Sequence, residues 1–403
     1  MSSCSSKILK HNENVTFVLN PSITYFKSVY RKHTKFSIDY KEEHPEGDQI
    51  IDADRSEITI PFHYAADLLC DISLKVRIGP GPGAPPHVVN TYTAVPPDIA
   101  LHLIWKIKFN FQSLISDFDI LDKEYINFYA MLNNPKSTKS TYSVENDRLT
   151  CNNGNNFQNM ALCGGVHGTV GSVTQYKYMT AIIPLPFAFS KSIGTAIPLC
   201  AFNQKTTTPQ IVIALDRRAT AQLDSTLIAA HKYSTISKYI FLSDEERKRF
   251  QTTRLEYLYE RVNSLPLTGT SNINISLLFA AHPIKQIFIQ NNPAESSNIL
   301  EYIIKINNAA MMNSNFHHDF FSKVEILNKF KGGNYAADGL CDNKIGVIDF
   351  SLKNTEGPSG CISPSNNVIS LNFGGGRQPS INIHTVCYYL LRISDQELKY
   401  VFN

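Results

Sequence analysis

The chain has 403 residues, of which 43% are hydrophobic and 18% are charged, an ordinary balance for a globular protein of two or three domains. The formal net charge of +3 is small for this length and argues against a protein that coats phosphate backbones. No apolar run approaches the roughly 20 residues of a membrane-spanning helix, and the N-terminus lacks the apolar core of a secretory signal. We therefore expect a soluble protein made and kept in cytosol-like surroundings.

The N-terminal region concentrates the positive charge, with seven Lys or Arg against two acids in the first 41 residues. Residues 1–16 are polar, and we expect them to form an arm with little to pack against. Asn20 suits a helix N-cap and Pro21 the first helical position. Phe26 and Tyr30 continue at helical spacing, which is typical of a core-facing stripe with the cations on a solvated face. Nucleic-acid binding by this region is therefore the less favoured interpretation.

Most of the remaining chain alternates with the period of two that half-buried β-strands have. Along four such strands we expect these residues to face inward: Ile72, Leu74, Val76 and Ile78; Leu103, Trp105, Ile107 and Phe109; Ile348, Phe350 and Leu352; Ile381, Ile383, Cys387, Tyr389, Leu391 and Ile393. Antiparallel sheets with one face packed on the core and the other exposed to solvent show this pattern. Long polar loops separate the strands and helical spacing is rare, so the fold class is all-β, a sandwich or a barrel.

A helix-start signal follows the strand pattern near the middle of the chain. Ser243 and Glu246, three residues apart, form a capping-box pattern. Asp244 in the first turn and Arg247 beyond it follow the helix dipole. Phe250 would anchor the helix on the core.

The order of strand, capped helix and strand thus occurs twice, and each copy precedes a strand-rich segment of some 150 residues. The second copy opens with a strand at 239–242. This weak repeat predicts two tandem β domains. We place their bounds as follows: an N-terminal arm at 1–16, a first domain at 17–217, a linker at 218–236 and a second domain at 237–403.

The residues usual in catalytic and metal sites do not form a recognised pattern. None of the twelve histidines forms an HxH pair, and the eight cysteines include no CxxC. The glycine-rich stretches at 79–83 and 373–377 lack the GKS/T of a phosphate loop, and no GxSxG nucleophile elbow occurs. We therefore predict no enzymatic activity and no cofactor or metal. Asn14 and Asn274 begin glycosylation sequons, which we expect to stay unmodified without secretion.

Several ordered segments resemble a known family. Residues 20–38 resemble the N-terminal signature of the major capsid proteins of nucleocytoplasmic large DNA viruses, and residues 239–250 are similar to the opening of their second domain. Further similar segments follow in the same order at 184–189, 196–202, 282–289, 350–363 and 386–394. The family-motif residues are Asn20, Pro21, Phe26, Tyr30, Arg31, Phe36, Ser243, Asp244, Glu246, Arg247, Phe250, Pro358, Ser359 and Gly360.

The resemblance implies a double jelly roll, two tandem eight-stranded antiparallel sandwiches with a short capped helix at the start of each. It implies a homotrimeric, pseudo-hexagonal capsomer that tiles an icosahedral shell, with neighbouring capsomers and minor capsid proteins as partners. It also implies assembly in the host cytoplasm and a location in the virion capsid. We expect the N-terminal arm to face the capsid interior and to order only against neighbouring copies, minor capsid proteins or an inner viral membrane. No specific nucleic acid is expected.

Other functions stay open at this point. A divergent paralogue of the same fold could be a minor capsid protein or a membrane scaffold. A jelly-roll module could also bind carbohydrate during attachment, which would need an aromatic-lined loop surface. A nucleic-acid-binding protein acting through the basic N-terminal region is the third alternative, and its affinity would fall steeply with salt.

Overall fold

A computed structural model describes most of the strand-forming parts of the chain. The residues described are 32–46, 57–62, 65–78, 101, 103–111, 115–133, 141–145, 148–152, 179–202, 207–216, 232–267, 272–275, 282–291, 302–310, 320–330, 345–352, 358–373, 381–394 and 397–401. The chain divides into two compact units, Met1–Lys35 and Phe36–Asn403, and the second unit holds every named strand. The predicted helix at 20–31 and the sequon at Asn14 lie outside the described residues.

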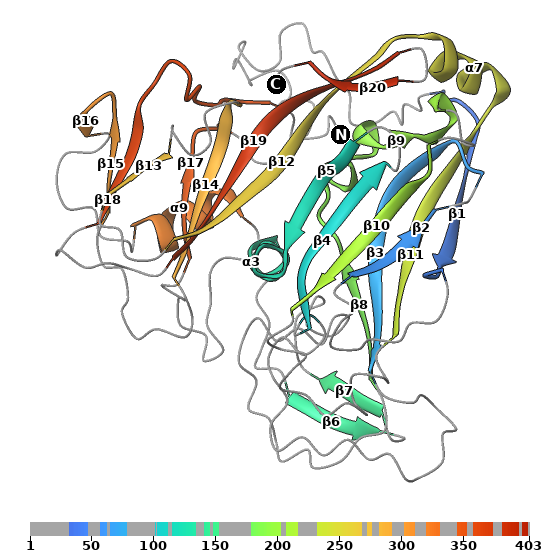
Figure 1. Cartoon of the computed structure of the whole chain (residues 1–403), viewed down its shortest axis with the longest axis horizontal. Coiled ribbons are helices and arrows are strands. Elements are labelled where there is room, and N and C mark those ends of the chain that lie inside the picture. The colour runs from blue at the N-terminus through green and yellow to red at the C-terminus, as the bar shows by residue number, and fades with distance from the viewer. Residues whose placement is uncertain are drawn as a thin grey trace, which may run out of the picture. The chain divides into compact units, whose positions relative to one another are not determined.

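The N-terminal half forms a sandwich of two antiparallel sheets (Figure 1). The first sheet runs in the order β1 (Phe36–Glu43), β11 (Lys232–Leu242), β3 (Leu68–Ile78) and β8 (Met179–Pro184), with β9 (Ile197–Pro198) added to β3. The second runs in the order β2 (Glu57–Pro61), β10 (Pro209–Leu215), β4 (Ile104–Phe111) and β5 (Ile115–Asp122). Aromatic rings fill the space between the sheets, with Phe109 within 6.0 Å of Phe62, Phe111, Phe118, Phe187 and Phe189.

The C-terminal half repeats this sandwich strand for strand. Its first sheet runs in the order β12 (Leu255–Leu267), β19 (Ile381–Ser394), β14 (Ile284–Asn291) and β17 (Ile345–Asp349), with β20 (Glu397–Tyr400) added to β19. Its second runs in the order β13 (Asn272–Asn274), β18 (Ile369–Phe373), β15 (Tyr302–Ile306) and β16 (Ala309–Ala310). In both halves the first sheet begins with the first strand of that half, followed by its last strand and then two middle strands, in the same order. The predicted pair of jelly rolls requires this order.

Short helices connect the strands. The helix α3 (Lys123–Asn133) follows β5, and α7 (Asp244–Thr252) joins β11 to β12. A π-helical turn, η4 (Phe320–Val324), and α9 (Glu325–Lys329) follow β16. The other elements are the short turns η1 (Ala188–Ser190), η2 (Ile193–Thr195) and η3 (Leu199–Ala201) and a separate hairpin of β6 (Thr141–Glu145) and β7 (Arg148–Asn152).

Two of the predicted alternations are confirmed. In β3, Ile72, Leu74 and Val76 are fully buried, while the residues between them are partly exposed; the side chain of Ile78 lies outside those the structure describes. In β19 every residue predicted to face inward is buried. His384, on the opposite face of β19, is also buried, because α3 of the N-terminal half covers that face. A strand covered on both sides loses its polar alternation.

The prediction for β4 is wrong at Trp105, which is 54% exposed, while Ile104 beside it is fully buried. The register shows the reason. Ile104 and Lys106 pair with Leu215 and Ala214, which are consecutive, so Trp105 is the extra residue of a β-bulge. A bulge resets which face each later side chain takes, and the alternation of the letters does not reveal it.

The prediction for the end of β17 is also wrong. The strand stops at Asp349, and Leu352, expected to face inward, is 84% exposed. Ser351, expected to face outward, is buried instead and bonds with its backbone N–H and its hydroxyl to Oδ1 of Asp349, at 2.7 and 2.6 Å. The Asp349 carboxylate thus turns the chain out of the sheet at this point.

The strand at 239–242 belongs to β11, which pairs with β1 and β3 in the N-terminal sandwich. These residues complete the first sandwich, whereas the sequence placed them at the start of the second, and β11 also includes 232–236 of the expected linker. The hydrophobic pattern predicts that a strand is present, but it does not predict which strand it pairs with. The other domain bounds stay a prediction.

The helix after β11 begins where predicted, but the capping box does not form. Ser243 is the N-cap, yet its side chain makes no cap hydrogen bond, and Oε2 of Glu246 is buried without a hydrogen-bond partner among the described residues. Arg247 holds the helix instead, donating from two nitrogens to the buried carboxylate of Asp67 at 2.7 and 3.0 Å. Phe250 packs against the cluster that contains Ile240, as an anchor should.

The turn at Pro358–Gly360 requires a glycine. Gly360 has a φ of +154°, and a Cβ there would lie 2.4 Å from the carbonyl oxygen of Phe350. Directly after the turn, Ile362 and Ile284 exchange backbone hydrogen bonds of 2.8 and 2.9 Å, which attaches the turn to the start of β14. The backbone fold here depends on the missing side chain.

We predict that Gly360→Ala lowers the free energy of unfolding by about 1–3 kcal/mol, because its Cβ meets backbone and its φ is strained. Gly194→Ala is the matched control, since a Cβ there meets only Oγ of Ser192 at 3.7 Å. Chemical denaturation of both variants measures the difference. Equal stability of the two variants would contradict the close approach.

Candidate functional site

The two sandwiches meet along one buried contact, which we call the seam. The N-terminal half contributes Phe118, Tyr125, Phe128, Lys191 and Thr195, and the C-terminal half contributes Tyr259, Glu260, Lys285, Phe288, His384 and Tyr400. The strands β5 and β12 are the outermost strands of their sheets. The seam therefore covers two edges that would otherwise offer unpaired backbone groups.

Aromatic side chains close the seam between β5 and β12. The ring of Phe118 lies edge-on to Tyr259 at 5.7 Å and stacks on Tyr400 at 6.2 Å. The two tyrosine hydroxyls each donate to a backbone carbonyl of the other half: Tyr400 to Phe118 at 2.8 Å and Tyr259 to Thr195 at 2.9 Å. The apolar bodies of these rings pack while their polar ends fix the register.

The helix α3 covers the outer face of the C-terminal sheet. Phe128 lies 5.1 Å from Phe288 and 5.0 Å from His384, and Tyr125 lies 5.9 Å from His384. The His384 ring is hydrogen-bonded to Ser264 at 2.7 Å. Burial lowers the pKa of His384 to about 3, so the ring is neutral at physiological pH.

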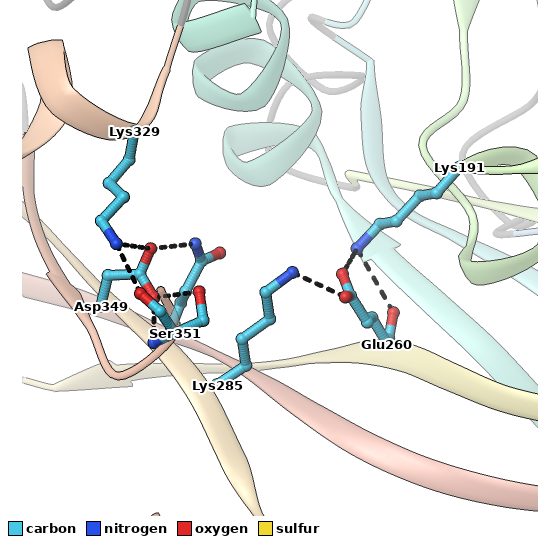
Figure 2. Close-up of polar contacts among 7 residues, drawn as sticks. Lys191, Glu260, Lys285, Lys329, Asp349 and Ser351 are labelled. Carbon is cyan, nitrogen blue, oxygen red and sulfur yellow. Dashed lines mark hydrogen bonds and ion pairs between the residues drawn. The ribbon is translucent and has the colours of Figure 1, made fainter. Parts of the chain in front are cut away.

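A largely buried ion triad crosses the seam (Figure 2). Glu260 on β12 receives Lys285 of β14 at 2.6 Å and Lys191, which follows η1, at 3.3 Å. The Lys285 side chain is 1% exposed. Burial by itself would raise the pKa of Glu260, but the two lysines outweigh it and hold that pKa below its ordinary value. Glu260 is thus an ionised bridge between a lysine of each half.

A second polar cluster lies nearby on the C-terminal half (Figure 2). The buried carboxylate of Asp349 accepts from the side chain of Gln286 at 2.9 Å and lies 3.7 Å from Nζ of Lys329 on α9. Lys329 also donates to the carbonyl of Ser351. These contacts attach α9 to the segment that leaves β17.

A buried carboxylate supports the N-terminal side of the seam. Asp119 on β5 accepts from the backbone N–H of Ala188 at 2.8 Å and of Ile120 at 3.0 Å. Burial raises the pKa of Asp119 to about 6, although Arg261 of β12 acts in the opposite direction. This carboxylate positions η1, and with it the loop that carries Lys191.

The sequence-predicted motif residues lie apart from the seam. Ser243, Asp244, Glu246, Arg247 and Phe250 lie on or beside α7, Pro358, Ser359 and Gly360 form the turn before Ile362, Phe36 begins β1 and Asn274 ends β13. Asn20, Pro21, Phe26, Tyr30 and Arg31 lie outside the described residues. The sequence analysis did not predict the seam. The signal that could have indicated it is a charged residue within a strand pattern, as at Glu260 and Lys285.

Among the described residues, no group of three or more His, Cys, Asp or Glu could hold a metal ion, and no helix is long and apolar enough to cross a membrane.

A family model described as "Major capsid protein N-terminus" matches residues 24–259, which is more than half of the chain. The chain belongs to the major capsid protein family. It is 26% identical over 276 residues to a major capsid protein of Pyramimonas orientalis virus, covering 66% of this chain and 59% of that relative. It is 24% identical over 291 residues to a major capsid protein of Paramecium bursaria Chlorella virus 1, covering 68% and 57%. The chain thus spans less than two thirds of the length of these family members.

Solved structures give the same fold. A structure of the PBCV-1 virus capsid superposes with a TM-score of 0.69 at 18% identity, covering 94% of this chain and all of that one. At this identity the likeness establishes the fold alone. Together with the strand orders of the two sandwiches, it shows that this capsid family member is a double jelly roll, as the sequence predicted.

We predict that Glu260→Gln lowers the free energy of unfolding by about 3 kcal/mol, because it leaves Lys191 and the buried Lys285 without their largely buried counter-charge. Glu256→Gln is the control on the same strand, since Glu256 pairs with Arg254 and Arg392 in solvent. The control should cost less than about 1 kcal/mol. Denaturant titrations compare them, and equal losses would show that the triad contributes nothing beyond a surface pair.

We predict that His384 makes the fold acid-sensitive. Its folded pKa of about 3 lies below its unfolded value, so as the pH falls below about 6.5 the unfolded chain binds a proton that the folded chain cannot. Between pH 7 and pH 5 the wild type should lose about 2 kcal/mol relative to His384→Gln. Thermal or urea unfolding of both proteins at the two pH values measures this. Parallel pH profiles would contradict a buried neutral histidine.

Proposed function

We propose that this chain is a structural, non-enzymatic capsid protein whose copies form a homotrimeric, pseudo-hexagonal capsomer of an icosahedral shell. The observation that carries the proposal is the seam. It joins two sandwiches of equal strand order through Phe118, Tyr259 and the triad around Glu260, as one unit. Three such units supply six similar sandwiches, which is the number a near-hexagonal tile needs.

The nature of the seam supports a structural role better than a catalytic one. Its lysines bind Glu260 and its tyrosine hydroxyls bind carbonyls, so these groups hold the protein together. The contacts between copies would be large and apolar, as obligate interfaces are. Contacts between capsomers, and with minor capsid proteins, would be smaller and more polar.

The location follows from the same proposal. The protein would be assembled in the host cytoplasm and reside in the virion capsid, where residues 1–16 would face an inner viral membrane. The family relation supports the virion location through relatives that are major capsid proteins. Specific nucleic acid is not among the proposed partners.

We expect light scattering on the purified chain to give about three times the 45.2 kDa of one protomer, and negative-stain images of the same sample to show hexagonal outlines. Trimers assemble because each copy offers two different surfaces that can close a ring. A monomer at every concentration would contradict the capsomer. Binding to sugar columns by such a monomer would favour an attachment module instead.

A further inference from the structure

The carboxylate of Asp349 at the end of β17 receives more hydrogen-bond donors than a simple ion pair needs (Figure 2). Its Oδ1 accepts from the backbone N–H of Ser351 at 2.7 Å and from the hydroxyl of the same residue at 2.6 Å. Its Oδ2 accepts from the side-chain amide of Gln286, the residue opposite it on β14, at 2.9 Å. Three donors therefore hold this fully buried carboxylate before Lys329 is counted.

The amine of Lys329 lies beside this carboxylate without forming a tight pair with it. Nζ is 3.7 Å from Oδ2 of Asp349, whereas charge-assisted hydrogen bonds between such groups measure about 2.7–2.9 Å. The same Nζ donates to the carbonyl of Ser351 and, at 3.3 Å, to that of Leu352. A neutral amine has two N–H groups. With both of them held by these carbonyls, its lone pair is directed toward the neighbouring Asp349.

A third titratable group lies close to the amine and the carboxyl. Glu325 precedes Lys329 by four residues on α9, which places the two side chains on one face of the helix. Burial raises the pKa of Glu325, and the charge of Asp349 adds to this, although Lys329 acts in the opposite direction. A carboxyl group with a raised pKa is suited to accepting and returning a proton near neutral pH.

We propose that Lys329 and Asp349 condense to an amide, which links α9 covalently to the end of β17. A proton first moves from the ammonium Nζ to Oδ2, which gives an amine and a carboxylic acid. Nζ then bonds to Cγ, and the negative charge that develops on Oδ1 is stabilised by the two donors of Ser351, as in an oxyanion hole. Glu325 carries a second proton from Nζ to Oδ2. The bond between Cγ and Oδ2 breaks, and one water molecule leaves.

This reaction needs no oxidant, cofactor or second molecule, because an ammonium and a carboxylate together equal an amide and a water. Separate amines and acids do not condense readily in water. Groups held in place within a protein reach effective concentrations of about 10⁵–10⁸ M, and the burial of Asp349 keeps out the water that would reverse the step. The step occurs once in each chain, so it is a self-modification without turnover.

The link would fasten a short helix that belongs to the cover of the C-terminal sheet. The helix α9 has only five residues, yet its Ile326 and the following Phe330 pack into the main hydrophobic cluster, where Phe330 lies 6.0 Å from Phe288. A covalent bond at Lys329 would keep these side chains in place. This inference goes beyond the proposed capsomer and does not depend on it.

The seam provides an internal comparison (Figure 2). Lys285 donates to Oε1 of Glu260 at 2.6 Å, and Lys191 donates to Oε2 at 3.3 Å. Each oxygen of this carboxylate is thus met by a lysine, in place of the paired Ser351 donors that Oδ1 of Asp349 has. We expect these lysines to remain ion-paired and unlinked.

Mass spectrometry of the full chain tests the link. After incubation of the folded protein and then denaturation, most wild-type chains should be lighter than their sequence by one water. The Lys329→Arg variant, which keeps the positive charge but lacks the amine, should have its full mass. In a tryptic map of the wild type, cleavage after Lys329 should be lost and its peptide should be joined to the one that contains Asp349. The peptides with Lys285 and Glu260 should stay separate.

Two further variants test the role of Glu325. Glu325→Gln removes the proton carrier and should slow the loss of water, followed from the time of synthesis, by at least about 100-fold. Glu325→Asp keeps a carboxyl group and should restore part of the rate. A merely structural role would change the melting temperature of both variants and leave the rate of linking unaffected.

The tryptic map of the wild type decides the proposal even if a variant does not fold. Normal cleavage after Lys329, with no joined peptide, overturns the link, as does a loss of water that maps elsewhere in the chain. Either result leaves the proposed capsomer standing. A joined peptide in the wild type, a full mass in Lys329→Arg and unlinked peptides at the seam would together establish the link.

Discussion

A single carboxylate with a lysine on either side fixes how the two halves of this molecule meet. Glu260 is paired with Lys285 within its own half, and Lys191 of the other half reaches it only when the seam forms. Buried ion pairs often add little net stability compared with apolar packing. Their effect is selective: a sandwich shifted along the seam would separate Lys191 from Glu260 and leave that lysine without its counter-charge. The aromatic rings supply the apolar burial, and the triad and the two tyrosine hydroxyls together set the register.

The supporting residues make the loop that carries Lys191 an integral part of the sandwich. Asp119 holds the start of η1 through the N–H of Ala188, and Tyr259 holds the end of η2 through the carbonyl of Thr195. The lysine is thus presented from a segment fixed at both ends. Loops held by buried hydrogen bonds lose little entropy when they dock, which is consistent with a seam formed once and kept.

The sequence predicted the individual strands better than the contacts between them. Period-two alternation identified the inner faces of β3 and β19, because burial on at least one side imposes it. It failed at Trp105, where one inserted residue changes the face without changing the pattern, and at Leu352, where Asp349 ends the strand. The seam could not be predicted, since it depends on residues about 70 and 25 positions apart meeting at Glu260. The double jelly-roll fold was recognised through ordered family motifs, most of which position backbone and lie outside the seam.

The pairing of β1 with β11 has a consequence for the way the protein is made. Phe36 pairs with Leu242, so the strand that opens the first sandwich waits for a partner that emerges from the ribosome about 200 residues later. At typical synthesis rates this takes on the order of 10–40 s. During that time β1, with its apolar side chains Phe36, Ile38 and Tyr40, lacks the strand it pairs with. Large-separation pairing of this kind folds slowly and is open to misassembly, so crowded synthesis of many copies would favour help from a chaperone before β11 arrives.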